Sequence, residues 1–306
     1  MIKDWFKAKP FTRKMSDPSG VTSNDLLNFW YSFFFTLSIK EPSLWVPSGD
    51  GDALAVNIAV RKKKIVNNLI GSSPFMLQRH FDKYIRIETQ FYKQEGEQMQ
   101  TIRKNVAKYL LDLKCVQLSP NDFFTYASGL KGPIYCDNRK VLSYPRERTS
   151  LIEGLKDLIL NSGLEYDVIA GLATAGVPYA SILADHLEKP LIYIRSKPKG
   201  HGQKNLIEGE YTSGQKIILI EDLVNQGSSV QKGIEASKEQ SLDPIACFSI
   251  VDYQMAPAKR VFEENKIPFF SLTNFSELVE TAKEISYLTD QECQNLAKWH
   301  NSLVGS

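Results

Sequence analysis

From residue 99 onward, short apolar runs alternate with stretches of helical periodicity. Apolar residues recur at helical spacing over 101–116 and again from Leu151 to Ile159, a helix expected to end near Gly163. Such alternation predicts an α/β fold in which a parallel sheet is flanked by helices on both faces. In these sheets, ligands bind beyond the carboxyl ends of the strands. The runs predicted as strands are 133–138, 167–170, 190–194, 216–221, 244–251 and 267–272.

Composition narrows the class of protein. The chain has 306 residues, of which 42% are hydrophobic and 24% charged, which is typical of a soluble globular protein with one large or two ordinary domains. A formal net charge of +2 gives no bias toward nucleic acid, and the aromatic run 29–39 is too short to span a bilayer. The four cysteines lie far apart without a C-x-x-C pair, which argues against a disulfide framework or a zinc site. We therefore expect a cytoplasmic protein with no membrane or nucleic-acid partner.

The stretch KIILIEDLVNQGSSV, residues 216–230, places two carboxylates between an apolar strand and a small polar loop. A loop such as Asn225–Ser229 that leads into a helix, expected here over 228–240, points backbone N–H groups and the positive end of the helix dipole at an anion. Glu221 and Asp222 would repel that anion, but they accept hydrogen bonds from hydroxyls. Phosphate in the loop and a diol on the acids describe a ribose 5-phosphate. The alternative, a strand that ends in acids before an ordinary helix cap, stays open from this stretch alone.

Two other loops belong to the same predicted edge. GLATAGVP, residues 171–178, also follows a short strand and opens a helix; its alternative reading is a tight packing turn. RSKPKGHGQKN, residues 195–205, is too rich in Gly and Pro for a stable helix and predicts a long mobile loop. A basic loop beside two anion-binding turns suggests a lid over a polyphosphate, although a solvated loop is the simpler reading. The basic residues of the lid are Arg195, Lys197, Lys199, His201 and Lys204.

These residues carry a family resemblance. IILIEDLVNQGSS resembles the phosphoribosyl pyrophosphate (PRPP) motif of type I phosphoribosyltransferases. The segment FFTYASGLKGPIYCDNRKVLSYP, residues 123–145, resembles the hood that orotate phosphoribosyltransferases place over the base, and the GLATAGVP loop and the lid resemble that family too. The resemblance covers 99–306. It implies a parallel sheet with a small hood and the conversion of orotate and PRPP to orotidine 5′-phosphate and pyrophosphate in pyrimidine synthesis. It also implies Mg²⁺ and a homodimer whose lid closes over the neighbouring site.

The resemblance also implies roles for individual residues. Glu221 and Asp222 match the acids that hold the ribose hydroxyls, and Asn225–Ser229 match the loop that holds the 5′-phosphate. Thr174, Ala175 and Gly176 match the pyrophosphate loop. The expected catalytic residues are Lys199, His201 and Asp222, with Lys199 contributing most. The full expected PRPP set is Arg195, Lys199, His201, Glu221, Asp222, Leu223, Val224, Asn225, Gln226, Gly227, Ser228 and Ser229. No protein-borne metal ligands are expected.

The base side departs from the family pattern. Asn225, which also lies near orotate, stands where Ser or Thr is usual, and Gln226 is bulkier than the usual residue. Ala175 and Tyr253 stand where some members carry a lysine and an arginine. Both changes remove positive charge that could meet the orotate carboxylate. Lys131 in the hood is a candidate replacement cation, against the simpler reading of a solvated lysine.

Two other functions compete with this one. A purine phosphoribosyltransferase would share the PRPP motif, but the hood segment argues against it. A regulator that keeps the site as a PRPP sensor would need a nucleic-acid-binding region. The only candidate is the run Arg61–Lys64, which lacks interleaved aromatic residues and a recognisable helix-turn-helix. The basic lid favours catalysis, because a sensor has no pyrophosphate to expel.

Residues 1–98 follow neither a sustained helical nor a strand period. KQEGEQ, residues 93–98, must be written in purine-rich codons, and Gln-Glu-Gly can read CAG-GAG-GGN, which contains a ribosome-binding sequence just before Met99. Our hypothesis is that translation starts at Met99. The alternative is a real extension with an unknown partner.

This hypothesis predicts the mass of the native protein. Intact-mass spectrometry of protein purified from its natural source should give a chain that begins at Met99. A mass matching the full 34.6 kDa chain would contradict the hypothesis.

Overall fold

The structure is a computed structural model, and it describes residues 99–126, 131–197 and 206–304. The predicted extension 1–98 and the predicted lid residues Lys199 and His201 lie outside the described residues.

A six-stranded sheet forms the centre of the fold, in the order β10-β9-β8-β5-β6-β7. All neighbouring strands are parallel except β7, which pairs antiparallel with β6. The predicted parallel sheet is confirmed, and each of its predicted strands is present with small shifts at the ends. The strands are β5 (Val168–Leu172), β6 (Leu191–Ile194), β7 (Ile207–Glu208), β8 (Lys216–Val224), β9 (Asp243–Asp252) and β10 (Phe269–Asn274).

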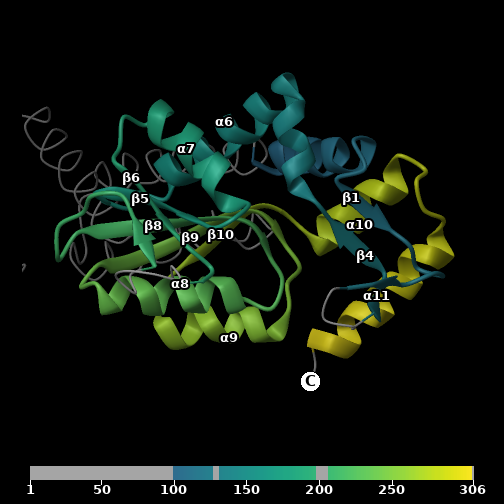
Figure 1. Cartoon of the computed structure of the whole chain (residues 1–306). Coiled ribbons are helices and arrows are strands. Elements are labelled where there is room, and N and C mark those ends of the chain that lie inside the picture. Colours follow the sequence, from purple (N-terminus) through teal and green to yellow (C-terminus); the bar gives the residue numbers. More distant parts are fainter. Residues whose placement is uncertain (1–98, 127–130, 198–205, 305–306) are drawn as a thin grey trace, which may run out of the picture. The chain divides into compact units, whose positions relative to one another are not determined.

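Helices cover both faces of this sheet, as predicted. Helices α6 (Pro145–Asn161) and α7 (Gly176–His186) lie on one face, and α8 (Ser228–Glu239) and α9 (Ala256–Asn265) lie on the other (Figure 1). The strands are buried on both sides: all five residues of β5 are buried, and Phe248 of β9 stacks on the ring of Phe270 at 4.9 Å. Burial on both faces explains why these strands have continuous apolar runs rather than alternating ones.

The helix predicted over 101–116 is wrong at its end. Residues 99–112 are helical, and Lys114 then adopts a left-handed conformation with φ 53°. Residues Val116–Leu118 form strand β1, which pairs antiparallel with β4 (Ile134–Cys136). Val116 and Leu118 are buried by this pairing, so their apolar character reflects a strand rather than another helical turn.

The hood consists of β1, β4 and a second short pair, β2 (Phe124–Thr125) and β3 (Lys131–Gly132). The strand predicted over 133–138 is therefore shorter than expected. A 3₁₀ helix, η3 (Asn138–Ser143), connects the hood to α6. Two C-terminal helices, α10 (Phe275–Glu284) and α11 (Asp290–Val304), complete the described chain, and Phe123 of the hood meets Trp299 of α11 edge-on at 6.4 Å. Within the described ranges, every helix is too short or too polar to serve as a bilayer span.

The start of α7 is packed so closely on β8 that only glycine fits. A Cβ on Gly176 would collide with the main-chain oxygen of Ile220, directly before the predicted acids. This contact fixes the distance between the turn before α7 and the end of β8.

We therefore predict that Gly176→Ala destabilises the protein by about 1–3 kcal/mol, although alanine is the better helix former by about 1 kcal/mol. Urea unfolding followed by circular dichroism measures the change. Gly214→Ala serves as a comparison that isolates backbone strain: Gly214 has φ 86°, which alanine adopts only with strain, but an added Cβ there meets no atom within 4 Å. A gain in stability for Gly176→Ala would show that the close packing is not a constraint.

Candidate active site

The sheet reverses its winding between β5 and β8. From β5 the chain crosses to β6 on one side, and it later returns to β8 on the other side of β5 before continuing to β9 and β10. The loops that leave the carboxyl ends of β5 and β8 therefore diverge to opposite sides. Such a switch point forms a crevice for ligands in open α/β sheets. The GLATAGVP loop and the acids with their polar loop flank this crevice, as the sequence predicted.

The first loop is the turn 173–175 between β5 and α7. The amide of Ala173 donates to the carbonyl of Ile194 at 2.8 Å, and the peptide between Ala173 and Thr174 is cis. Thr174 is exposed at the tip of the turn, whereas Gly176 is buried against β8. The turn therefore lies next to the acids at the end of β8.

The two acids at the end of β8 have different environments. Glu221 is only 6% exposed, and its carboxylate accepts hydrogen bonds from the amide of Asp222 at 3.0 Å and from Oγ of Ser229 at 2.8 Å. Burial, and next the charge of Asp222, raise the pKa of Glu221 to about 8. Asp222 is half-buried; burial raises its pKa, and hydrogen bonds from Glu221 and from nearby amides, with a smaller effect from the charge of Arg139, oppose that rise. The pair thus combines an inward carboxylate that holds the loop and a more open one.

The second loop leads from β8 into α8. Gly227 has φ 77° and precedes the helix, and a Cβ there would lie 3.0 Å from the Cα of Ala258 in α9. No side chain caps the first turn of α8, while Ser228 and Ser229 are exposed. An exposed helix start with hydroxyl groups is suited to an anion.

The other predicted residues of this loop differ in how exposed their side chains are. Gln226 is exposed and Asn225 is half-buried. The side chain of Val224 is buried in the core, so only its main chain can face a ligand.

The predicted lid connects β6 to β7, which are paired in the sheet. Arg195 follows β6, and its amide donates to the carbonyl of Leu206 at 2.8 Å, which extends the β6–β7 pairing by one step. The guanidinium of Arg195 also lies 3.4 Å from a carboxylate oxygen of Glu208 on β7. The described ends of the predicted lid, Arg195 and Leu206, therefore lie at the same edge of the sheet as the two loops predicted to bind anions.

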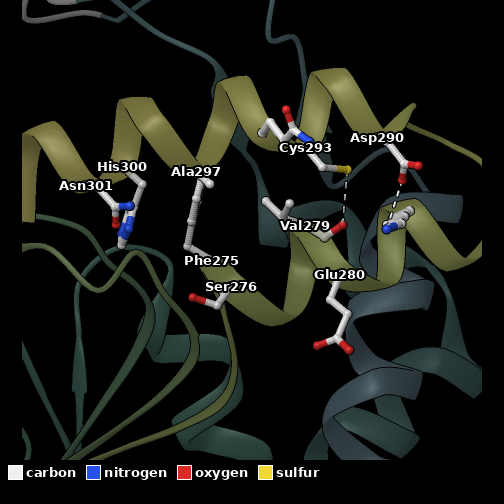
Figure 2. A pocket seen from close by; sticks show the side chains of 11 residues that line it. Phe275, Ser276, Val279, Glu280, Asp290, Cys293, Ala297, His300 and Asn301 are labelled. Carbon is white, nitrogen blue, oxygen red and sulfur yellow. Dashed lines mark hydrogen bonds and ion pairs between the residues drawn. The ribbon is translucent and has the colours of Figure 1, made fainter.

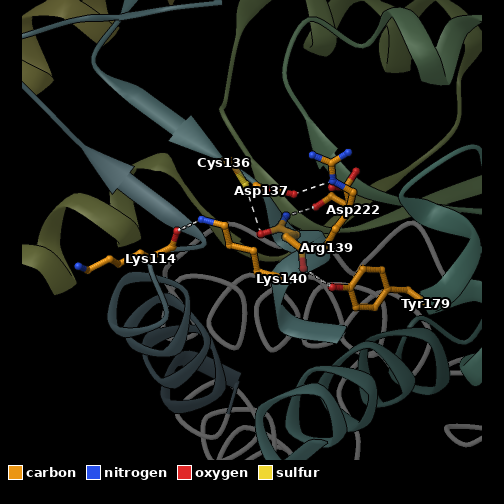
Figure 3. Close-up of polar contacts among 8 residues, drawn as sticks. Lys114, Cys136, Asp137, Arg139, Lys140, Tyr179 and Asp222 are labelled. Atoms are coloured by element: carbon orange, nitrogen blue, oxygen red, sulfur yellow. Dashed lines mark hydrogen bonds and ion pairs between the residues drawn. The ribbon is translucent and has the colours of Figure 1, made fainter. Parts of the chain in front are cut away.

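Sequence reasoning missed the residues that connect the hood to the acids. The side chain of Asn138 is fully buried, and its Nδ2 donates to the carbonyl of Asp222 at 2.8 Å (Figure 3). Arg139, next in the chain, is mostly exposed, and its Nε donates to Asp137 at 2.6 Å. Both residues stand in the segment CDNRK that follows β4, but a polar run after a short strand gave no signal of a buried contact 84 positions away. Lys131, the predicted hood cation, is exposed in β3.

Tyr253, which stands where some members of the family carry an arginine near the base, is buried. Tyr253 is 4% exposed; its amide donates to Val224, and its carbonyl lies 2.9 Å from Nε2 of His300 in α11. Burial raises the pKa of the neighbouring Asp252 to about 6. The C-terminal helix is thus tied to the strand that ends beside the crevice.

A cavity of about 530 Å³ lies between α10 and α11 (Figure 2). Phe275, Cys293 and His300 line it, and the ring of His300 stacks on Phe275 at 4.4 Å. None of the residues predicted for PRPP or orotate lines this cavity. This cavity is therefore separate from the predicted site at the strand ends.

Comparisons with known proteins agree with this geometry. The family described as "Phosphoribosyl transferase domain" matches residues 144–279. Orotate phosphoribosyltransferase of Staphylococcus haemolyticus is 40% identical over 200 residues, 65% of this chain and 99% of that protein. Orotate phosphoribosyltransferase of Bacillus pumilus is 43% identical over 198 residues, 65% of this chain and 93% of that protein.

The chain belongs to the orotate phosphoribosyltransferase family. The predicted resemblance and fold class are thereby confirmed. Among solved structures, UMP synthase of Leishmania donovani superposes with a TM-score of 0.58 at 26% identity, covering 71% of this chain and 47% of that one. Orotate phosphoribosyltransferase of Aeropyrum pernix has the same fold, with a TM-score of 0.51 at 24% identity over 60% of this chain and 99% of that one.

The burial of Glu221 predicts how the free energy of unfolding depends on pH. The pKa of Glu221 rises from an ordinary value of about 4.3 in the unfolded chain to about 8 in the folded protein, so the folded state binds more protons between these values. The stability that this protonation supplies is present at low pH and is lost as pH rises through that window. We expect Glu221→Gln to flatten the decline in the free energy of unfolding between about pH 5 and about pH 8.

Urea unfolding at several pH values measures this slope for both proteins. Glu235→Gln, which makes the same substitution at an exposed carboxylate on α8, is the matched control. Equal slopes for wild type and Glu221→Gln would contradict the assigned protonation of Glu221.

Proposed function

We propose that this protein is an orotate phosphoribosyltransferase, which converts orotate and PRPP to orotidine 5′-phosphate and pyrophosphate in pyrimidine synthesis. One observation supports this above the others. The carboxylate pair and the two loops for phosphate groups flank the same switch point, in a chain that covers nearly the whole length of relatives of that name.

Each part of PRPP has a proposed contact. The 5′-phosphate accepts hydrogen bonds from the start of α8, over Asn225–Ser229. The ribose hydroxyls donate to Asp222 and to Glu221, whose oxygens have further lone pairs beyond the bonds to Asp222 and Ser229. The pyrophosphate lies at the turn 173–175, with Arg195, Lys199 and His201 of the lid above it.

The reaction is a substitution at the anomeric carbon, in which a nitrogen of orotate forms a bond as the bond to pyrophosphate breaks. Positive charge develops on the ribose ring, and negative charge grows on the leaving oxygen. Asp222 stabilises the first, and the basic lid stabilises the second. Holding both substrates at the crevice supplies the remaining acceleration through proximity.

Magnesium fits this site as a substrate-borne ion. Among the described residues, no cluster of three or more His, Cys, Asp or Glu side chains could hold a metal. Mg²⁺ prefers substrate oxygens and its own waters, and when bound it would neutralise charge on the pyrophosphate.

Orotate is an anion, and its carboxylate requires positive charge near the hood. With Ala175 and Tyr253 uncharged, the proposed cations are Lys131 of β3 and the exposed Arg139 of η3. Asn225 contacts the base through its amide. We further propose a cytoplasmic homodimer that binds no nucleic acid or membrane, with each lid closing over the partner's site.

The direct test is loss of orotate absorbance when purified protein is mixed with PRPP and Mg²⁺. Hypoxanthine, xanthine and uracil are assayed in parallel by product formation. We expect turnover of orotate alone. Measurable PRPP binding without turnover of any base would favour the alternative of a PRPP sensor instead.

The shared lid makes a separate prediction. Lys199→Ala and Asp222→Asn should each lower kcat by about 100-fold or more. When the two inactive proteins are mixed, dissociated and reassociated, heterodimers should recover activity, because one site then has both an intact lid and an intact acid. With random exchange about a quarter of the sites are restored. Near-full turnover by Lys199→Ala would contradict its catalytic role, and no recovery on mixing would contradict the shared lid.

A further inference from the structure

Asn138 is buried where the hood meets the sheet. It is the first residue of η3, two positions after the end of β4, and none of its surface is exposed. A buried amide must find partners for both its donor and its acceptor atoms, since leaving either unpaired costs about 1–3 kcal/mol. The partners of Asn138 therefore show what this position does.

Three hydrogen bonds join Asn138 to three different parts of the site (Figure 3). Its Nδ2 donates to the carbonyl of Asp222 at 2.8 Å, and its Oδ1 accepts from Sγ of Cys136 in β4 at 3.2 Å. Its own carbonyl accepts from the hydroxyl of Tyr179 in α7 at 2.6 Å. Tyr179 is itself fully buried, on the helix that starts at the pyrophosphate turn.

The bond to Asp222 replaces a missing strand partner. β5 pairs with β8 only as far as Gly171 opposite Ile220, so Asp222 lies beyond the last pair on that side. On the other side β8 stays paired with β9 beyond Asp222, as far as Val224 opposite Asp252. The Asn138 amide therefore holds the free side of the strand at the residue that carries the more open carboxylate.

We propose that Asn138 is a positioning residue for the transfer reaction, which fixes Asp222 against both the base hood and the helix behind the pyrophosphate turn. The inference rests on the proposed function for its chemistry. Asn138 does not touch the reacting atoms. It fixes the relative positions of the three regions proposed to bind the base, the ribose and the pyrophosphate.

The test compares Asn138→Ala and Tyr179→Phe with Ser162→Ala. Ser162 also makes a buried side-chain bond to a carbonyl, to Ile159 at 2.6 Å, but at the opposite end of α6, away from the crevice. For each protein, urea unfolding gives stability, calorimetry gives PRPP affinity, and steady-state kinetics give kcat and both KM values per folded enzyme.

We expect Asn138→Ala to lower kcat/KM for PRPP by about 10- to 100-fold, with weaker PRPP binding, because Asp222 is displaced. Tyr179→Phe removes one bond and should lower kcat/KM by about 3- to 10-fold. Ser162→Ala should lose stability but keep kcat and both KM values. If Asn138→Ala does not fold, Tyr179→Phe carries the same test.

Unchanged KM and kcat in folded Asn138→Ala and Tyr179→Phe would overturn the positioning role. That result is distinct from failure of the proposed function, which would appear as a wild-type protein that does not consume orotate. In that case PRPP affinity alone still tests Asn138, and equal affinities for wild type and both variants would overturn the inference.

Discussion

The site depends on one buried carboxylate. Glu221 lies at the end of a strand covered on both faces, and it accepts a hydrogen bond from Ser229 in the first turn of the next helix. That bond joins the strand that carries the acids to the loop proposed for phosphate, so separating the two would leave one oxygen of a buried carboxyl group without its hydrogen-bond partner. The loop's shape, the exposed start of α8 and the placement of Asp222 follow from this contact and from the glycine at 227 that lets the chain turn.

A second constraint comes from the start of α7, the helix that follows β5. Because Gly176 has no Cβ, α7 starts against the main chain of β8, and the turn before it lies beside the acids. Asn138 closes the arrangement from the hood side. In the proposed complex the 5′-phosphate therefore meets main-chain N–H groups whose places are set by packing, whereas the pyrophosphate and the base also meet side chains of the lid and the hood.

Much of the fold was predictable because most of its strands and helices produce a pattern within a short stretch of sequence. The strands of the sheet are continuous apolar runs, and the helices between them have the 3.6-residue period, so both are visible in sequence. The small-residue loops were also visible, because stretches rich in glycine and serine between a strand and a helix predict turns.

The rest depends on contacts between distant residues. β1 continues the apolar period of the helix before it, so the sequence predicts more helix there. Only its pairing with β4 makes it a strand. β2, β3 and β7 have two residues each, which is too few for a period to appear. Asn138 and Tyr179 gave no signal because their partners lie 84 and 41 positions away. The inward direction of Glu221 was likewise invisible, since two adjacent acids on a strand look equivalent in sequence.

A crystal structure of the protein with PRPP and Mg²⁺ would show whether the substrate binds at the ends of β5 and β8. The account predicts the 5′-phosphate on the main-chain N–H groups of 225–229, the ribose hydroxyls on Asp222 and Glu221, and the pyrophosphate against the turn 173–175. It also predicts that the bond between Asn138 and Asp222 persists. PRPP bound elsewhere, such as the cavity between α10 and α11, with the strand ends free of ligand, would contradict the account.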